Sequence, residues 1–277
     1  MTDLTIEPIA GALGAEIGGV DLTRSLDEGV VVAIRKALLD HLVIFFRDQA
    51  LSPTDLARLG RYFGMLGQYP FVQGLLDHPG VIEVKKLEHE KVNFGGIWHS
   101  DTTYLDEPPM GSILHAVEVP ASGGDTMFAN MYMAYDALSP GMKRALAGLS
   151  GVSSSAKADV SRTREDRIAA NPGRKARENF EAVHPAVRTH PETGRKALYV
   201  NVAHTVRFDG MTEAESAPIL GFLFSHQIKP EFTCRFRWRL GSVAFWDNRA
   251  SQHNPINDYH GQRRIMRRIT IAGDRPR

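Results

Sequence analysis

The longest apolar runs in this 277-residue chain are only strand-sized, and this limits the possible folds more than any other feature. Residues 42–46 form one such run. No run approaches the roughly 18–20 apolar residues of a membrane span. Residues 232–240 alternate, with apolar side chains on one face: Phe232, Cys234, Phe236 and Trp238. No βαβ rhythm or glycine-rich phosphate loop is present. Many short strands with a few helices predict a mainly β protein, with an antiparallel core and flanking helices.

Element positions follow from periodicity and from capping residues. Ser52-Pro53-Thr54-Asp55 offers an N-cap, a proline at the first helical position and an acid in the first turn, so a helix is expected to follow it to about Phe63. Other helices are expected over 27–40, 131–138, 139–149 and 212–227. Strands are expected within 4–20 and at 42–46, 81–86, 113–119, 125–129, 186–190, 197–201, 232–240, 242–246 and 264–271. We interpret residues 1–277 as one domain.

Composition excludes several classes of function. The net charge of +1 gives no bulk electrostatic reason to bind nucleic acid or an anionic membrane. Cys234 is the single cysteine, so a disulfide framework and a cysteine-based zinc site are excluded. The N-terminus lacks the basic-then-apolar plan of a signal peptide. We therefore expect a cytoplasmic protein, in keeping with a reducing compartment.

Residues 156–179 differ from the rest of the chain. They are rich in basic residues and hold very little apolar material. A solvated surface insertion is the simplest interpretation. The alternatives are a lid that orders over a site when an anionic ligand arrives, or a subunit contact.

Trp98-His99-Ser100-Asp101 contains a His-x-Asp triplet, which chance alone can supply. In an extended strand, however, His99 and Asp101 project from the same side and can bind one ion. A remote histidine would complete a set of two histidines and one carboxylate, which leaves open positions and suits non-haem Fe(II) and O₂. His253, which follows the buried-looking strand at 242–246, is one candidate for this third ligand. The other downstream candidates are His115, His184, His190, His204, His226 and His260.

Two arginines near the C-terminus point to anion binding. Alternation in residues 264–271 places Arg264, Met266, Arg268 and Thr270 on one face of a strand. Two guanidinium groups on an inner face require anions, and a guanidinium matches a carboxylate well. Exposed arginines on an edge strand remain the alternative interpretation.

With these residues the chain resembles the taurine/α-ketoglutarate dioxygenase family of Fe(II)- and 2-oxoglutarate-dependent oxygenases over nearly its whole length. The resemblance implies a double-stranded β-helix, or jelly-roll, core. It implies His99, Asp101 and His253 as Fe(II) ligands, and Arg264 with Thr126 as the residues that hold the distal carboxylate of 2-oxoglutarate. The motifs that carry it are Leu13-Gly14-Ala15-Glu16-Ile17, Phe46-Arg47-Asp48-Gln49, Trp98-His99-Ser100-Asp101, Pro108-Pro109, Gly123-Gly124-Asp125-Thr126, His184-Pro185, Arg188-Thr189-His190-Pro191, Trp246-Asp247-Asn248-Arg249 and Gln262-Arg263-Arg264-Ile265-Met266.

The implied reaction consumes 2-oxoglutarate and O₂, hydroxylates a C–H bond and releases succinate and CO₂. Arg268 matches the family position that meets an anionic group of the prime substrate. Taurine-specific members present histidine, asparagine and phenylalanine about where Tyr69, Gly95 and His204 stand. We therefore expect a different pocket, lined by these three residues with Thr102 and Arg268. Its substrate would be a small organic anion of the sulfonate, alkyl sulfate or aryloxyalkanoate type, with taurine possible but not favoured.

Other functions stay open at this point. A jelly roll with the same ligands can be a zinc or manganese hydrolase or isomerase, or an anion-binding module without catalysis. Relatives in the family are often dimers or tetramers, so a homo-oligomer is expected by analogy.

Overall fold

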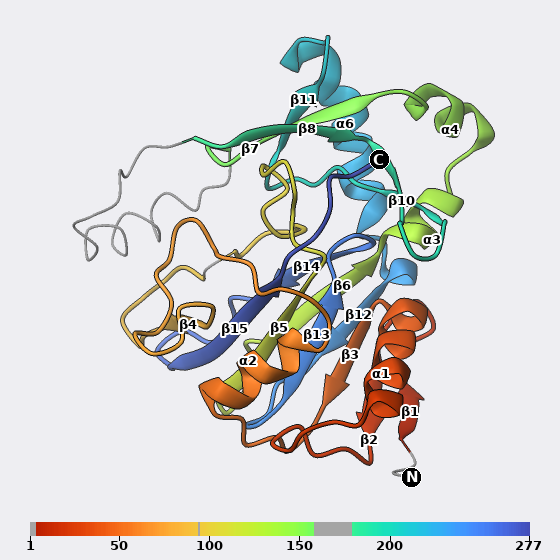
Figure 1. Cartoon of the computed structure of the whole chain (residues 1–277). Coiled ribbons are helices and arrows are strands. Elements are labelled where there is room, and N and C mark those ends of the chain that lie inside the picture. Colours follow the sequence, from red (N-terminus) through yellow and green to blue (C-terminus); the bar gives the residue numbers. More distant parts are fainter. Residues whose placement is uncertain (1–3, 94, 158–178) are drawn as a thin grey trace.

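The computed structural model describes residues 4–93, 95–157 and 179–277, and its largest element is a seven-stranded sheet (Figure 1). Neighbouring strands of this main sheet are antiparallel, except that β2 and β3 are parallel. The order is β1 (Thr5–Pro8), β2 (Ala15–Gly18), β3 (Val43–Phe46), β13 (Val243–Asp247), β5 (Gly111–Glu118), β15 (Arg264–Ile271) and β4 (Ile82–Lys86). A strand near the start of the chain, β3, is therefore paired with β13, which lies near its end.

Smaller sheets complete the β structure of the described residues. One sheet is formed by β12 (Thr233–Phe236), β6 (Thr126–Asn130) and β14 (Ser251–Pro255), and it packs against the main sheet. A second is formed by β11 (Thr205–Phe208), β7 (Ser150–Ser154) and β8 (Glu181–Pro185). A hairpin of β9 (Val187–Thr189) and β10 (Lys196–Leu198) follows β8 along the chain.

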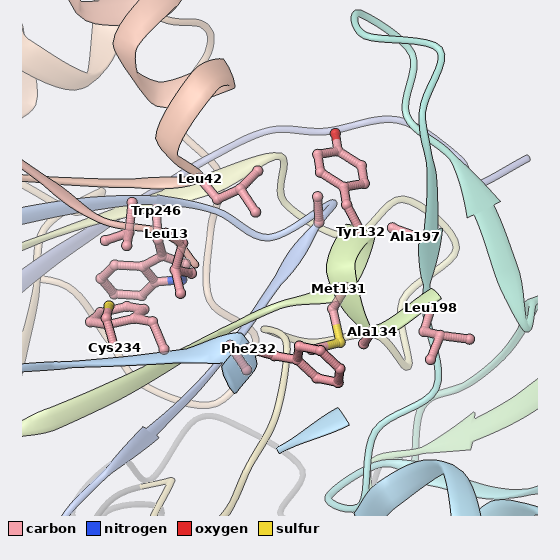
Figure 2. Packing of buried hydrophobic residues seen from close by; sticks show 14 of the residues in the cluster. Leu13, Leu42, Met131, Tyr132, Ala134, Ala197, Leu198, Phe232, Cys234 and Trp246 are labelled. Atoms are coloured by element: carbon pink, nitrogen blue, oxygen red, sulfur yellow. The ribbon is translucent and has the colours of Figure 1, made fainter. Parts of the chain in front are cut away.

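Two hydrophobic clusters lie on opposite faces of the main sheet. In β3, Phe45 belongs to the cluster between the sheets, whereas Ile44 and Phe46 belong to the other, because successive strand residues project to opposite faces. The Phe45 ring stacks on Phe236 of β12 with 3.8 Å between ring centroids. Figure 2 shows Trp246 of β13 within this inter-sheet cluster. The predicted fold class, a mainly β jelly-roll core with flanking helices, is confirmed.

Helices α1 (Glu28–His41) and α2 (Pro53–Arg61) cover the second cluster (Figure 1). α2 begins as the sequence predicts. Ser52 Oγ accepts from the Asp55 N–H at 3.2 Å, and the Asp55 carboxylate accepts from the Ser52 N–H at 3.0 Å. Thr212 and Glu215 form the same capping box at α6 (Glu213–Gln227). The remaining helices are α3 (Met131–Asp136), α4 (Pro140–Leu146) and the 3₁₀ helix η1 (Pro230–Phe232).

The strand predictions are incomplete. β7, β11 and β14 occur where no strand is predicted, and β8 lies just before the strand expected at 186–190. β14 has the sequence Ser251-Gln252-His253-Asn254-Pro255, whose polar side chains are mostly buried rather than alternating with apolar ones. These residues are buried because they surround a polar site and not because they form a hydrophobic face. A search for alternating apolar residues therefore does not detect β14.

The insertion expected at 156–179 lies outside the described residues, apart from its first two residues and its last. In the parts of the chain that the structure does describe, no helix has the length and apolar character needed to cross a membrane.

Candidate active site

His99, Asp101 and His253 come together in space. His99 Nε2 lies 3.7 Å from Asp101 Oδ1, and His253 Nε2 lies 3.8 Å from the same oxygen. One ligand atom from each residue lies within 4.8 Å of the other two. Across residues 4–93, 95–157 and 179–277, this is the one group of histidine, cysteine or carboxylate side chains with the spacing of a metal site.

The backbone brings the two histidines together through a single β-bridge. The His99 N–H donates to the His253 carbonyl at 3.0 Å, and the His253 N–H donates back to His99 at 2.8 Å. His253 belongs to β14, which pairs with β6. The chain then turns at Asp101, and Thr102 has a φ of +44°. The expectation of one extended strand through His99 and Asp101 is therefore wrong, because a turn and not strand alternation directs Asp101 toward His99.

Asn248 holds this turn in place, a role that the sequence analysis missed. Its backbone carbonyl accepts from Ser100 Oγ at 2.6 Å, and its Oδ1 accepts from the Asp101 N–H at 3.3 Å. The same Oδ1 accepts from Trp246 Nε1–H at 3.0 Å. The sequence signal was available, since Trp246 and Asn248 belong to one motif at the end of a buried strand.

Hydrogen bonds fix which atoms are free to bind a metal ion. His99 Nδ1 bonds to the carbonyl of Ile97 at 2.7 Å, which leaves Nε2 facing Asp101. Asp101 Oδ2 accepts from Ser112 Oγ at 2.8 Å and from Arg268 Nη2 at 2.7 Å, which leaves Oδ1 facing both histidines. A bound cation is the natural partner for this oxygen and these nitrogens.

The charge states of the ligands suit a divalent cation. Burial opposes ionisation of Asp101, but the Arg268 guanidinium, together with the hydrogen bond from Ser112, outweighs burial and holds the pKa of this carboxyl below its usual range. Burial, with His99 nearby, keeps the pKa of His253 well below its ordinary value. At neutral pH the site therefore offers one carboxylate and two neutral imidazoles. This donor set fits Fe(II).

Two pockets adjoin these residues, and both are lined by His99 and Arg268. The first, here the Arg264 pocket, has an empty volume of about 460 Å³. It is lined by Val84, His99, Leu114, Thr126, Phe128, Trp238, Trp246, His253, Pro255, Arg264 and Arg268. The second, here the Tyr69 pocket, has an empty volume of about 410 Å³. It is lined by Tyr69, Gly95, Ile97, His99, Asp101, Thr102, Tyr104, Ala203, His204 and Arg268.

The Arg264 pocket contains a buried cation with free donors. Arg264 is 6% exposed, and within the described structure its Nε and Nη2 have no hydrogen-bond partner. Burial lowers the pKa of Arg264 from its ordinary value. Thr126 Oγ1 accepts from Trp238 Nε1–H at 2.9 Å, so the Thr126 hydroxyl proton remains available to a ligand. A buried guanidinium with unused donors beside a free hydroxyl fits a carboxylate.

The Tyr69 pocket gathers all five residues that the sequence analysis assigned to the substrate, namely Tyr69, Gly95, Thr102, His204 and Arg268. Gly95 has a φ of +71°, and a Cβ there would lie 3.0 Å from Cε1 of His99, so the position admits no side chain without movement. Burial lowers the pKa of His204 to about 3, so its imidazole is neutral. Tyr104, which no sequence pattern indicated, also lines the pocket.

Other candidate histidines lie away from the site. Nε2 of each is bonded to a separate acceptor: His115 to the Gln49 carbonyl, His184 to the Leu105 carbonyl, His190 to the Asp247 carboxylate and His226 to the Ala134 carbonyl. These contacts account for their burial without a metal ion.

Known proteins resemble this chain along its whole length. The family model described as "Taurine catabolism dioxygenase TauD, TfdA family" matches residues 5–270. The alpha-ketoglutarate-dependent sulfate ester dioxygenase of Pseudomonas putida is 37% identical over 99% of this chain and 91% of its own length. An alkylsulfatase of Acinetobacter baylyi is 34% identical over 98% of this chain and 86% of its own. The crystal structure of AAD-2 in complex with Mn(II) and N-oxalylglycine has a TM-score of 0.82 and 27% identity, and covers 99% of both chains.

Proposed function

Because this chain belongs to the TauD, TfdA family of dioxygenases, and is thus an enzyme that uses Fe(II), 2-oxoglutarate and O₂, we propose that its prime substrate is a sulfate ester or sulfonate with an apolar body. One observation carries the proposal. Arg264 and Arg268 lie on the same face of β15, yet Arg264 lines only the first of the two pockets, while Arg268 reaches both. Arg264 can therefore bind 2-oxoglutarate, while Arg268 can bind the sulfate ester or sulfonate.

His99 Nε2, Asp101 Oδ1 and His253 Nε2 would hold the iron. When bound, Fe(II) supplies the redox chemistry by which O₂ converts 2-oxoglutarate to succinate and CO₂ and one oxygen atom enters a C–H bond of the anion. Ser112 and Arg268 engage the second oxygen of Asp101, so they orient the carboxylate and keep it ionised.

The Arg264 pocket would bind 2-oxoglutarate. Arg264 Nε and Nη2 donate to the distal carboxylate, and the Thr126 hydroxyl adds a third donor. The apolar side chains of Val84, Leu114 and Phe128 line the pocket and exclude water from the chain between the two acidic ends. This assignment keeps both arginines occupied by different ligands.

The Tyr69 pocket would bind the prime substrate, and its chemistry suits an anion without an ammonium group. Within the described residues, Asp101 is the one carboxylate that lines it, and Arg268 already pairs with Asp101. Aromatic rings extend from the pocket: Tyr69 lies 5.8 Å from Phe71, which lies 5.9 Å from Tyr104 and 5.5 Å from Phe180, between ring centroids. An alkyl or aryl body packs on such a wall.

Oxidation next to the ester oxygen of a sulfate ester would release the sulfate. The hydroxylated carbon would then carry both a hydroxyl and the sulfate oxygen, and it would collapse to an aldehyde and hydrogen sulfate. The sulfate ester dioxygenase and the alkylsulfatase to which the chain is similar support this substrate class.

Succinate release tests the proposal. The enzyme with Fe(II), 2-oxoglutarate and O₂ is assayed with octyl sulfate, octanesulfonate, taurine, phenoxyacetate and octanol. We expect substrate-dependent succinate with the sulfate or sulfonate, little with taurine and none with octanol. If succinate formation depended on octanol and on none of the anions, Arg268 would not be the residue that binds the substrate.

Three further expectations belong to the proposal. A homo-oligomer is expected by analogy with the family. A cytoplasmic location suits a chain with one cysteine. One domain with an insertion at 156–179 fits the shared core, and limited proteolysis with and without 2-oxoglutarate and octyl sulfate would test whether the insertion closes over the site.

A further inference from the structure

A chain of hydrogen bonds leads from the protein interior to His204 in the Tyr69 pocket. Asn201 Nδ2–H donates to Thr103 Oγ1 at 3.0 Å, and Thr103 Oγ1 lies 3.0 Å from His204 Nδ1. All three side chains are buried, with Thr103 fully inaccessible and Asn201 1% exposed. Of these three hydrogen-bonded residues, His204 is the one that lines the pocket.

The direction of each hydrogen bond follows from the contacts. The His204 N–H donates to Asn201 Oδ1 at 2.9 Å, which fixes the amide so that its nitrogen faces Thr103. Thr103 Oγ1 therefore accepts from Asn201, and its own proton has His204 Nδ1 as the acceptor within reach. With Thr103 donating in this way, His204 Nδ1 is the acceptor, and the proton of the neutral imidazole is assigned to Nε2.

His204 Nε2 is the free end of this series of hydrogen bonds. Among the described residues it has no hydrogen-bond partner. The His204 ring lies 6.1 Å from the His99 ring and 4.9 Å from the Tyr104 ring, between centroids. A donor with a fixed proton therefore lies close to a metal ligand and to the aromatic wall.

Arg268 alone offers few donors to a substrate. Its Nη2 contacts Asp101 Oδ2 at 2.7 Å and Ser112 Oγ at 3.2 Å, which occupies both hydrogens on that nitrogen. Its Nε is buried without a partner among the described residues, which leaves Nη1 as the accessible nitrogen. A sulfo group has three terminal oxygens, so one nitrogen of Arg268 leaves acceptors on the anion unpaired.

We propose that His204 is a specificity-determining residue whose Nε2–H donates to the sulfo group beside Arg268, and that Thr103 and Asn201 are positioning residues that place its proton. The inference rests on the proposed function, since it assigns the second donor of the same substrate site. A proton held on Nε2 favours an acceptor oxygen at this point and disfavours an ammonium group, which can only donate.

Nitrogen NMR tests the proton placement without turnover. Protein labelled with ¹⁵N-histidine is prepared with Zn²⁺ in place of Fe²⁺, together with 2-oxoglutarate. The His204 signals should show a protonated Nε2 and an unprotonated Nδ1, and octyl sulfate should shift the Nε2–H signal downfield. In Thr103→Val the preference for this tautomer should weaken. A proton on Nδ1 in the wild-type protein would overturn the proposal even if sulfate esters are substrates.

Kinetics test the contact with the anion. His204→Phe keeps the ring and its contact with Tyr104 but removes the donor, so KM for octyl sulfate should rise about 10- to 100-fold while kcat changes little. His204→Asn, whose amide can donate, should recover part of the loss. As a matched control, His226→Phe replaces another buried imidazole, bonded to the Ala134 carbonyl, and should keep the wild-type KM.

The outcomes separate the two proposals. If no sulfate ester or sulfonate is turned over by the wild-type enzyme, the proposed function fails while the NMR result still reports the tautomer. If octyl sulfate is a substrate but KM is the same in wild type and His204→Phe, the donor role of His204 is wrong. Equal losses in His204→Phe and His204→Asn would also contradict it, because a packing effect needs no donor.

Discussion

Asp101 uses its two carboxylate oxygens differently, and much of the site follows from this one side chain. Oδ1 faces the two histidines, whereas Oδ2 accepts from Ser112 and Arg268. Arg268 therefore contacts a proposed metal ligand and also lines the proposed substrate pocket. Substrate and metal binding are expected to influence each other through this guanidinium, in contrast to Arg264, which has no such contact with Asp101.

The two arginines can be separated by matched substitutions. Arg264→Met should raise KM for 2-oxoglutarate by roughly 30-fold or more, because a desolvated charge pair is lost, while Fe(II) affinity stays near wild type. Arg268→Met should raise KM for octyl sulfate and also weaken Fe(II) binding, because Asp101 loses its partner. Steady-state kinetics and Fe(II) titration measure both effects. Identical behaviour of the two variants would contradict their assignment to different ligands.

At the scale of secondary-structure elements, an ionic network joins β13, the β9–β10 hairpin and α1, with a buried centre at Asp247, His190 and Arg249 and a partly exposed end at Glu192 and Arg35. The Asp247 carboxylate accepts from His190 Nε2–H at 3.0 Å and from Arg249 at 2.7 and 2.9 Å. Arg249 continues to Glu192 at 2.7 Å, and Glu192 pairs with Arg35 of α1 at 2.8 Å. The site-bearing segment after β13 is thus anchored to elements on two sides.

Asp247→Asn should destabilise the fold by about 3–5 kcal/mol at pH 7, since it leaves the 4% exposed Arg249 without its main charge partner. Burial raises the pKa of Asp247, but Arg249 and His190 outweigh it and hold the pKa below its usual range. The stabilising contribution of the Asp247 carboxylate is therefore complete above its pKa in the unfolded chain, about 4. This contribution is lost as the pH falls toward the lower pKa of Asp247 in the folded protein.

Urea unfolding at several pH values measures how the stabilising contribution of Asp247 changes with pH. Between about pH 4 and pH 2 the wild-type protein should lose more stability than Asp247→Asn does. A steeper acid dependence in the variant would show that Asp247 is not the group responsible.

At the scale of the whole molecule, iron and 2-oxoglutarate should bind as one unit between the sheets. Under anaerobic conditions the protein with Fe(II) and 2-oxoglutarate should show a weak visible charge-transfer band, and the pair should raise the melting temperature, because both bind the folded state. His99→Ala should abolish the band, and EDTA should reverse the thermal shift. A wild-type protein without the band would argue against the assigned ligands.

Local features of this protein follow directly from short residue patterns in its chain. The alternation of β15 places Arg264, Met266 and Arg268 on one buried face, Ser52 caps its helix as predicted, and the helix expected at 212–227 forms. Periodicity and capping act over a few residues, so a single sequence contains them. The family motifs then indicated the three ligands, and the structure brings these residues together.

Contacts between remote segments, in contrast, depend on the folded arrangement of the strands. β14 forms although its own sequence does not predict a strand, and its bridge to His99 brings His253 to the site. Asn248 holds Ser100 across 148 residues, and Arg268 pairs with Asp101. These contacts depend on which strands pair and in which register, and local patterns do not specify register between distant strands. For the same reason, the hydrogen-bond chain from Asn201 to His204 was visible only once the fold had brought Thr103 beside them.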